Sequence, residues 1–168
     1  SEMCIRDRST VDVMANEAIQ DINIVAGCLK QWFRELPDPL LTYQLYPAFI
    51  EASKIENDFL RQVRLHEQVN NLPDANYATL RFLMAHLDRI RAHESINQMS
   101  AHNLAIVFGP TLLRSPHEAQ MAGAGAAASH GGVGQMYFPD MSLQCKAIET
   151  ILLKYRDIFV ESDEDDLS

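Results

Sequence analysis

Two basic side chains, Lys30 and Arg34, stand one helical turn apart, and Asn23 and Gly27 precede them at spacings of four and three residues. At a helical period these four positions share one face, about 140° from the centre of the neighbouring apolar stripe. Because like charges one turn apart repel, the pair gives the helix itself nothing. The pair would suit a carboxylate or phosphate supplied by another molecule. On spacing alone, an ordinary solvated face with Arg34 complementing the negative helix end is the favoured interpretation.

Other patterns that could carry chemistry lack the context that the chemistry needs. Residues 123–128 (GAGAAA) form a G-x-G-x-x-A sequence, but a dinucleotide site needs a strand before it and a helix after it. The sequence contains no P-loop motif and no G-x-S-x-G elbow. We therefore predict no nucleotide site, no self-contained hydrolytic site and no cofactor.

Histidines and cysteines do not suggest a metal site either. His86 and His93 lie two turns apart without a third ligand nearby in sequence, which favours a helix surface or a partly buried position. Cys28 adjoins the apolar stripe and is predicted to be a small buried hydrophobe. With Cys4 and Cys145 it makes an odd number without C-x-x-C spacing, so neither a disulfide framework nor a zinc ribbon is indicated. A reducing, cytoplasmic setting fits best.

A helical period dominates the elements that position these residues. The first predicted helix starts after Asp21, its candidate N-cap, and ends at Leu36, because Pro37 and Pro39 cannot continue it. Its apolar stripe comprises Ile22, Val25, Leu29, Trp32, Phe33 and Leu36.

Further helices follow along the chain. The pattern predicts them through residues 46–50, through Leu60, Val63 and Val69, over residues 74–93, from an N-cap at Ser100 to Gly109-Pro110, and over residues 142–159. The helix over residues 74–93 carries an apolar face of Tyr77, Leu80, Leu83, Met84, Leu87 and Ile90. Strand-like alternation is almost absent, so we predict an all-α fold of about six helices.

Composition is that of one soluble domain. The 168 residues are 47% hydrophobic and 22% charged, and no apolar run approaches the roughly 20 residues that span a bilayer. The net charge of -9 argues against a nucleic-acid partner, and no direct membrane insertion is expected.

Three segments differ in character from the rest. Residues 161–168 hold five carboxylates and no base, and are predicted to form a disordered acidic tail. Residues 117–136 hold five of the seven glycines and are predicted to be a flexible surface insertion. Residues 1–8 (SEMCIRDR) resemble translated adapter sequence and are predicted to be a non-native leader, which makes the chain a fragment lacking natural sequence before about residue 9.

Three further segments resemble one known family. These are residues 29–40 (LKQWFRELPDPL), 72–87 (LPDANYATLRFLMAHL) and 97–112 (NQMSAHNLAIVFGPTL). Together they resemble RhoGAP domains, helical modules that accelerate GTP hydrolysis by Rho-family GTPases. Order and spacing agree across about residues 20–116, and residues 140–159 resemble the closing helix. The resemblance implies a RhoGAP-type helical bundle over residues 9–160, incomplete at its N-terminus.

The resemblance also implies roles for five residues. Lys30 matches the family lysine that faces the bound GTPase, and Arg34 matches the arginine that supports the loop carrying the catalytic arginine. Asn103 matches the asparagine that contacts the GTPase near its switch regions, with Met99 and Pro110 as flanking contacts. Residues 43–55 and 79–87 are most similar to the chimaerin type, which would favour Rac. GTP and Mg²⁺ would belong to the GTP-bound partner.

One family element has no counterpart in the sequence. The family's arginine finger lies upstream in a G-[IVL]-[FY]-R-x-S-G loop, and Arg6 and Arg8 lack its flanking glycines and serine. The resemblance therefore implies no catalytic residue in this chain, with weak binding and little stimulation. The complete protein would be a GTPase activator and not itself an enzyme, cytoplasmic and recruited to membranes through other parts.

Two alternatives remain. The first is a RhoGAP-like adaptor that binds a Rho-family GTPase without accelerating it. The second is a structural helical domain whose Lys30 and Arg34 face is only solvated surface.

Overall fold

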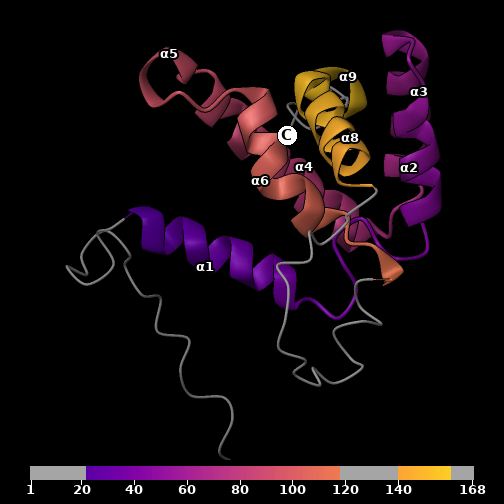
Figure 1. Cartoon of the computed structure of the whole chain (residues 1–168), viewed down its shortest axis with the longest axis horizontal. Helices are drawn as coiled ribbons and strands as arrows, with labels where there is room; N and C mark the ends of the chain where they lie inside the picture. The colour runs from indigo at the N-terminus through magenta and orange to yellow at the C-terminus, as the bar shows by residue number, and fades with distance from the viewer. Residues whose placement is uncertain (1–21, 118–139, 160–168) are drawn as a thin grey trace, which may run out of the picture.

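Helices are the regular secondary structure of the part of the protein that the structure describes. A computed structural model describes residues 22–117 and 140–159, and within these two ranges every regular element is a helix and no strand occurs (Figure 1). This confirms the predicted all-α fold. The helices are α1 (Ile22–Glu35), α2 (Tyr46–Lys54), α3 (Asp58–Asn70), α4 (Asp74–Arg91), α5 (Glu94–Asn97), α6 (Ala101–Leu112), α8 (Met141–Leu153) and α9 (Tyr155–Ile158).

The sequence predicted about six of these helices. It missed α5 and α9, which have four residues each and are too short to show a periodicity. The single closing helix predicted over residues 142–159 is in fact divided at Lys154, whose φ of -106° and ψ of 20° depart from helical values. None of the helices in the described ranges is both long and apolar enough to cross a lipid bilayer.

Local signals place the helix ends. α1 stops two residues before Pro37, and α2 accommodates Pro47 in its first turn, where no intrahelical donor is needed. The side chain of Asn57 caps α3 by accepting a backbone hydrogen bond of 3.0 Å, and that of Ser100 caps α6 with one of 3.1 Å. The predicted N-cap at Ser100 is thus confirmed.

The core forms around α8, which packs against α6, α2, α3 and α4. On α8 the buried apolar side chains include Ala147, Ile148, Ile151 and Leu152. On α4 they are Leu80, Leu83, Met84 and Leu87, with Tyr77 and Ile90 half-buried at the edges of the same face. Both sets agree with the periodicity in the sequence.

The prediction that Gly109-Pro110 closes the helix that begins at Ser100 is wrong, because α6 continues two residues beyond Pro110. Proline cannot donate to the carbonyl of Ile106, but the helix bonds resume when Leu113 N donates to Gly109 O at 3.0 Å. Gly109 serves packing instead. A Cβ there would lie 3.0 Å from the Cα of Cys145, so the glycine allows α6 and α8 to approach closely.

On α3 the buried face differs from the apolar pattern of the sequence. Val69 is buried, but Leu60 and Val63 are 54% and 39% exposed. Arg61 takes the buried position, and its Nε donates to Thr150 Oγ1 of α8 at 3.1 Å. A hydrogen-bonded arginine thus packs where the periodicity predicted an aliphatic side chain.

The apolar stripe of α1 is only partly covered. Phe33 is buried and Leu36 half-buried, whereas Leu29 and Trp32 are 37% and 54% exposed. Cys28 is exposed, so its prediction as a buried hydrophobe is wrong. The physical reason is that no described helix covers this side of α1, which lies at the edge of the bundle (Figure 1).

Four sequence predictions fall outside the described residues and stay predictions. They are the N-cap at Asp21, the leader at residues 1–8, the acidic tail at residues 161–168 and, from residue 118 on, the glycine-rich insertion.

Candidate functional site

The cationic face of α1 consists of Lys30 and Arg34. Arg34 is exposed and Lys30 half-buried, and they lie one turn apart on the same side of the helix. Within the described residues, neither charged group has a hydrogen-bond or ion-pair partner. No contact inside the described residues thus occupies either cation.

Gly27 belongs to the same face, three residues before Lys30. A Cβ placed on Gly27 would meet no atom of the described residues within 4 Å. Internal packing of the described chain thus does not explain the glycine, although glycine weakens a helix interior. The side chain of Asn23, the fourth member of the predicted stripe, lies outside the described residues.

The second part of the site is built by the turn that joins α5 to α6. Gln98 adopts a left-handed conformation with φ 58°. The side chain of Asn97 braces this turn, donating to Ile90 O at 2.8 Å and accepting from Met99 N at 2.8 Å. These bonds attach the start of α6 to the end of α4.

Asn103 lies in the first turn of α6 and is exposed. Its backbone N–H donates to Ser100 Oγ at 3.1 Å, and its side-chain Nδ2 donates to Gln98 O at 2.9 Å. Its Oδ1 is an acceptor that has no hydrogen-bond partner among the described residues. A protein partner with an N–H or hydroxyl donor could use this oxygen.

Two other predicted contact residues flank Asn103. Pro110 is half-buried two turns along α6, and Ile106 lies between them at helical spacing with 44% of its surface exposed. Met99 is half-buried and packs against the core, so part of its side chain serves the fold and is not on the surface. Ile106 is not among the residues that the sequence predicted for this face. The available signal was a large apolar residue sharing the helix face of Asn103 and Pro110.

The structure brings these two faces onto neighbouring helices. α1 packs mainly against α6, and Figure 1 shows it passing alongside the end of α6 away from α5. Arg114, just after α6, donates to the carbonyl oxygens of Arg34 and Leu36. Lys30 and Arg34 thus share one helix, Asn103 and Pro110 share another, and the chain joins the two directly.

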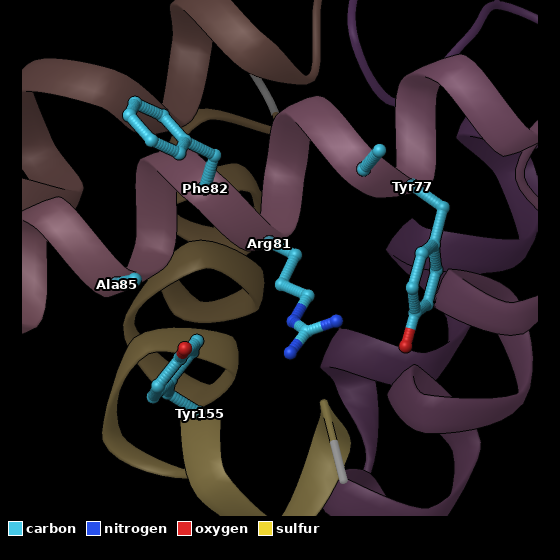
Figure 2. A pocket seen from close by; sticks show the side chains of 6 residues that line it. Tyr77, Arg81, Phe82, Ala85 and Tyr155 are labelled. Atoms are coloured by element: carbon cyan, nitrogen blue, oxygen red, sulfur yellow. The ribbon is translucent and has the colours of Figure 1, made fainter. Parts of the chain in front are cut away.

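Among the described residues, two grooves lie beside α4, and the side chains that line them include no predicted site residue. One, of about 430 Å³, is lined by Tyr77, Ala78, Arg81, Phe82, Ala85 and Tyr155, and Figure 2 shows Arg81 extending between the two tyrosines. The other, of about 440 Å³, is lined by Leu29, Trp32, Phe33, Thr79, Phe82, Leu83 and His86. Arg34 and Asn103 of the predicted site are instead exposed on helix surfaces, which suits a macromolecular partner more than a small molecule.

Groups with perturbed acidity lie elsewhere. Burial and the Asp140 carboxylate raise the pKa of Tyr46 to about 12, and burial raises the pKa of the Cys145 thiol. The described residues hold no cluster of His, Cys, Asp or Glu that could bind a metal ion. His86 and His93 are exposed on or just after α4, in agreement with the predicted helix surface. What the site offers is positive charge and hydrogen-bonding groups.

A comparison with protein families decides what this arrangement belongs to. The model of the RhoGAP domain family matches residues 3–117. The chain belongs to the RhoGAP domain family. The match covers α1 to α6, and with them all five predicted site residues.

Individual relatives agree with this RhoGAP assignment. N-chimaerin of Rattus norvegicus is 52% identical over 117 residues, which cover 70% of this chain and 35% of that protein. Beta-chimaerin of Rattus norvegicus is 48% identical over 116 residues, covering 69% of this chain and 39% of that protein. The chain thus spans well under half the length of these chimaerins, which bears out the chimaerin-like resemblance for the domain alone.

Solved structures confirm the RhoGAP-type helical bundle. Human Rho GTPase activating protein 15 superposes with a TM-score of 0.70 at 36% identity, over 87% of this chain and 62% of that one. The BH domain of GRAF, the GTPase regulator associated with focal adhesion kinase, gives a TM-score of 0.67 at 34% identity, over 83% and 66%.

Proposed function

We propose that this RhoGAP domain binds a Rho-family small GTPase in its GTP-bound form and, in the complete protein, stimulates GTP hydrolysis by that partner. The observation that carries the proposal is the cationic face of α1. Lys30 matches the family lysine that faces the GTPase, and Arg34 matches the arginine that supports the finger loop. Within the described residues their charged groups have no partner. GTP and Mg²⁺ are held by the GTPase, so the domain is a regulator of a partner's reaction.

Each site residue has a proposed task. Lys30 attracts acidic groups of the GTPase, and Arg34 supports the loop that carries the catalytic arginine. Asn103 contacts the switch regions, a role supported by its exposed position and by an Oδ1 that has no partner among the described residues. Pro110 flanks this contact, whereas Met99, packed partly on the core, mainly shapes the turn before α6.

Stimulation depends on an arginine finger, for which the printed sequence has no matching loop. An arginine supplied in trans is worth about 10³–10⁵ in the rate of GTP hydrolysis. This chain alone is therefore expected to bind Rac, Rho or Cdc42 and to stimulate little. The chimaerin-like character of the domain favours Rac.

Binding is tested by titrating Rac, Rho and Cdc42, each loaded with a non-hydrolysable GTP analogue, into the purified chain in a calorimeter. Lys30→Ala and Asn103→Ala are expected to weaken binding. Lys54→Ala is the matched control, because Lys54 is exposed on α2 and pairs with Glu51 at 2.5 Å. Unchanged affinity in both site variants would show that the site is wrongly placed.

The alternative is an adaptor function, in which the domain binds a Rho-family GTPase without accelerating its GTP hydrolysis. It is distinguished by GTP turnover with the natural upstream sequence restored. An arginine in the finger position and strong stimulation support the activator. Binding without stimulation supports the adaptor, and no binding to any GTP-loaded Rho-family protein supports a purely structural domain.

Partner class and location follow from the same surface. Two cations on a chain of net charge -9 are too few to neutralise the phosphates of a nucleic acid, but they suit a local acidic patch on a protein. We place the protein in the cytoplasm, where Rho-family GTPases act, with any membrane recruitment left to other parts of the complete protein.

A further inference from the structure

Few side chains anchor α1 to the rest of the domain. From Ala26 to Glu35, the described part of its side chains, Phe33 is the only buried one. Leu29 and Trp32 are exposed along the groove that separates α1 from α4. Apolar packing within the described chain therefore constrains the direction of α1 only weakly.

Hydrogen bonds instead hold the segment that follows α1. Asn76 of α4 donates from Nδ2 to Leu40 O at 2.9 Å, and Leu41 N donates to Leu112 O at 3.1 Å. These two contacts fix the linker to α4 and α6. They act five or more residues beyond the end of α1, so they do not by themselves set the angle of the helix.

Arg114 acts on α1 itself. Its Nη1 donates to Arg34 O at 2.7 Å, and its Nη2 donates to Leu36 O. Both acceptors lie at the carboxyl end of α1, where the helix dipole is negative and the carbonyls lack intrahelical donors. The guanidinium thus satisfies the helix end and binds it at two points.

The rest of the Arg114 side chain is also fixed. Its guanidinium carbon lies 5.8 Å from the centroid of the Tyr43 ring. Its Nε is buried and has no hydrogen-bond partner among the described residues. This unpaired donor is an energetic cost of the position in which Nη1 and Nη2 make their two bonds. Because the guanidinium is planar and rigid, two bonds to two carbonyls define an orientation that a single ammonium could not.

We propose that Arg114 is a positioning residue for the GTPase-binding face. It holds the end of α1 against the end of α6, and so keeps Lys30 and Arg34 at a fixed angle to Asn103. This inference rests on the proposed function, and it adds a residue that touches no GTPase itself. A preorganised face avoids the cost of ordering α1 during binding.

The variants Arg114→Gln and Arg114→Lys test the proposal. Arg64→Gln is the matched control, because Arg64 is an exposed arginine of α3 that pairs with Glu67 at 2.9 Å. Calorimetry with GTP-analogue-loaded Rac, Rho and Cdc42 should show about tenfold weaker binding for Arg114→Gln, as expected for one lost charge-assisted bond, and no change for the control. Arg114→Lys should lose less affinity than Arg114→Gln but should still bind more weakly than the original chain. Full affinity in Arg114→Lys would contradict the proposal that the two-point guanidinium contact positions α1.

A double-mutant cycle separates positioning from a general loss of stability. If Arg114 acts through α1, Lys30→Ala should weaken binding less in the Arg114→Gln background than in the original chain, since Lys30 is already misplaced. Asn103→Ala, on α6, should have the same effect in both backgrounds. Additive effects of Lys30→Ala and Arg114→Gln would overturn the proposal.

Amide hydrogen exchange on the chain without a GTPase provides the independent readout. Arg114→Gln should speed exchange in the last turns of α1 and leave α3 unchanged. Unchanged exchange in α1 would overturn the positioning role whatever the binding data show. Faster exchange in a chain that binds no Rho-family GTPase would instead overturn the proposed function, leaving Arg114 as the residue that holds α1.

Discussion

Two helical glycines with opposite surroundings allow a stringent test of the structure. At Gly27 on α1, an added Cβ meets no atom of the described residues within 4 Å. At Gly109 on α6, the same Cβ meets the Cα of Cys145 at 3.0 Å, its N at 3.1 Å and the carbonyl carbon of Gln144 at 3.2 Å. The substitution to alanine should therefore change stability in opposite directions at the two sites.

The magnitudes follow from two terms. Alanine is favoured over glycine in a helix interior by about 1 kcal/mol, so Gly27→Ala should stabilise the protein by roughly 0.5–1 kcal/mol. Gly109→Ala has the same gain but forces a contact with the α8 backbone, which cannot rotate away as a side chain would. Overpacking of this kind costs about 1–3 kcal/mol, which leaves a net loss of up to roughly 2 kcal/mol.

Urea unfolding and thermal unfolding of the original protein, Gly27→Ala and Gly109→Ala measure these changes in stability. For a domain of this size, about 1 kcal/mol corresponds to a shift in Tm of roughly 2–4 °C. A second variant checks the cause. Because Gly109→Ala meets backbone atoms, the added change Cys145→Ala should not restore stability. A stabilised Gly109→Ala, or rescue by Cys145→Ala, would refute the close approach of α6 and α8.

Three further predictions concern other parts of the molecule. Burial and Asp140 raise the pKa of Tyr46 to about 12. The neutral Tyr46 hydroxyl therefore contributes fully to the stability of the folded protein below pH 10, and this contribution is lost as pH rises toward 12. Unfolding midpoints should therefore fall in that window, and a Tyr46→Phe variant with an equal fall would contradict the assignment. Trp32, 54% exposed, should show solvent-like emission and ready acrylamide quenching, and Trp32→Gln should reduce binding of a hydrophobic dye; shielded, blue-shifted emission would count against the exposed stripe. Arg61→Leu should cost about 2–4 kcal/mol in chemical unfolding because buried acceptors lose their donor, whereas Arg64→Leu, at an exposed pair, should change little; equal effects would contradict the burial of Arg61.

Local sequence signals were enough for most of the fold. The apolar period of α4 predicted its buried face because that helix packs on one side only, and the Ser100 cap marked the start of α6. The Gly109-Pro110 pair misled because glycine and proline also occur inside helices where another helix approaches closely. That approach, by Cys145 of α8, depends on residues far away in the sequence.

Burial was harder to predict than helicity. Cys28 and Trp32 lie on or beside an apolar stripe, yet both are exposed because no described element covers that side of α1. Arg61 is buried because Thr150 and two backbone carbonyls accept its hydrogen bonds, which no periodicity can indicate. Burial on α3 depends on acceptor atoms of other segments. Exposure on α1 follows because no described element covers that side of the helix.

The candidate site shows the same division between local and tertiary information. Lys30 and Arg34 share a face in any regular helix, so their spacing alone was sufficient to group them. What relates them to Asn103 is Arg114, 80 residues beyond Arg34, acting through main-chain carbonyls. Exposed charges contribute little to binding individually, because water and salt screen them. The selectivity of such a surface must then come from the fixed arrangement of its few groups, and in this domain that arrangement depends on how α1 is held against α6.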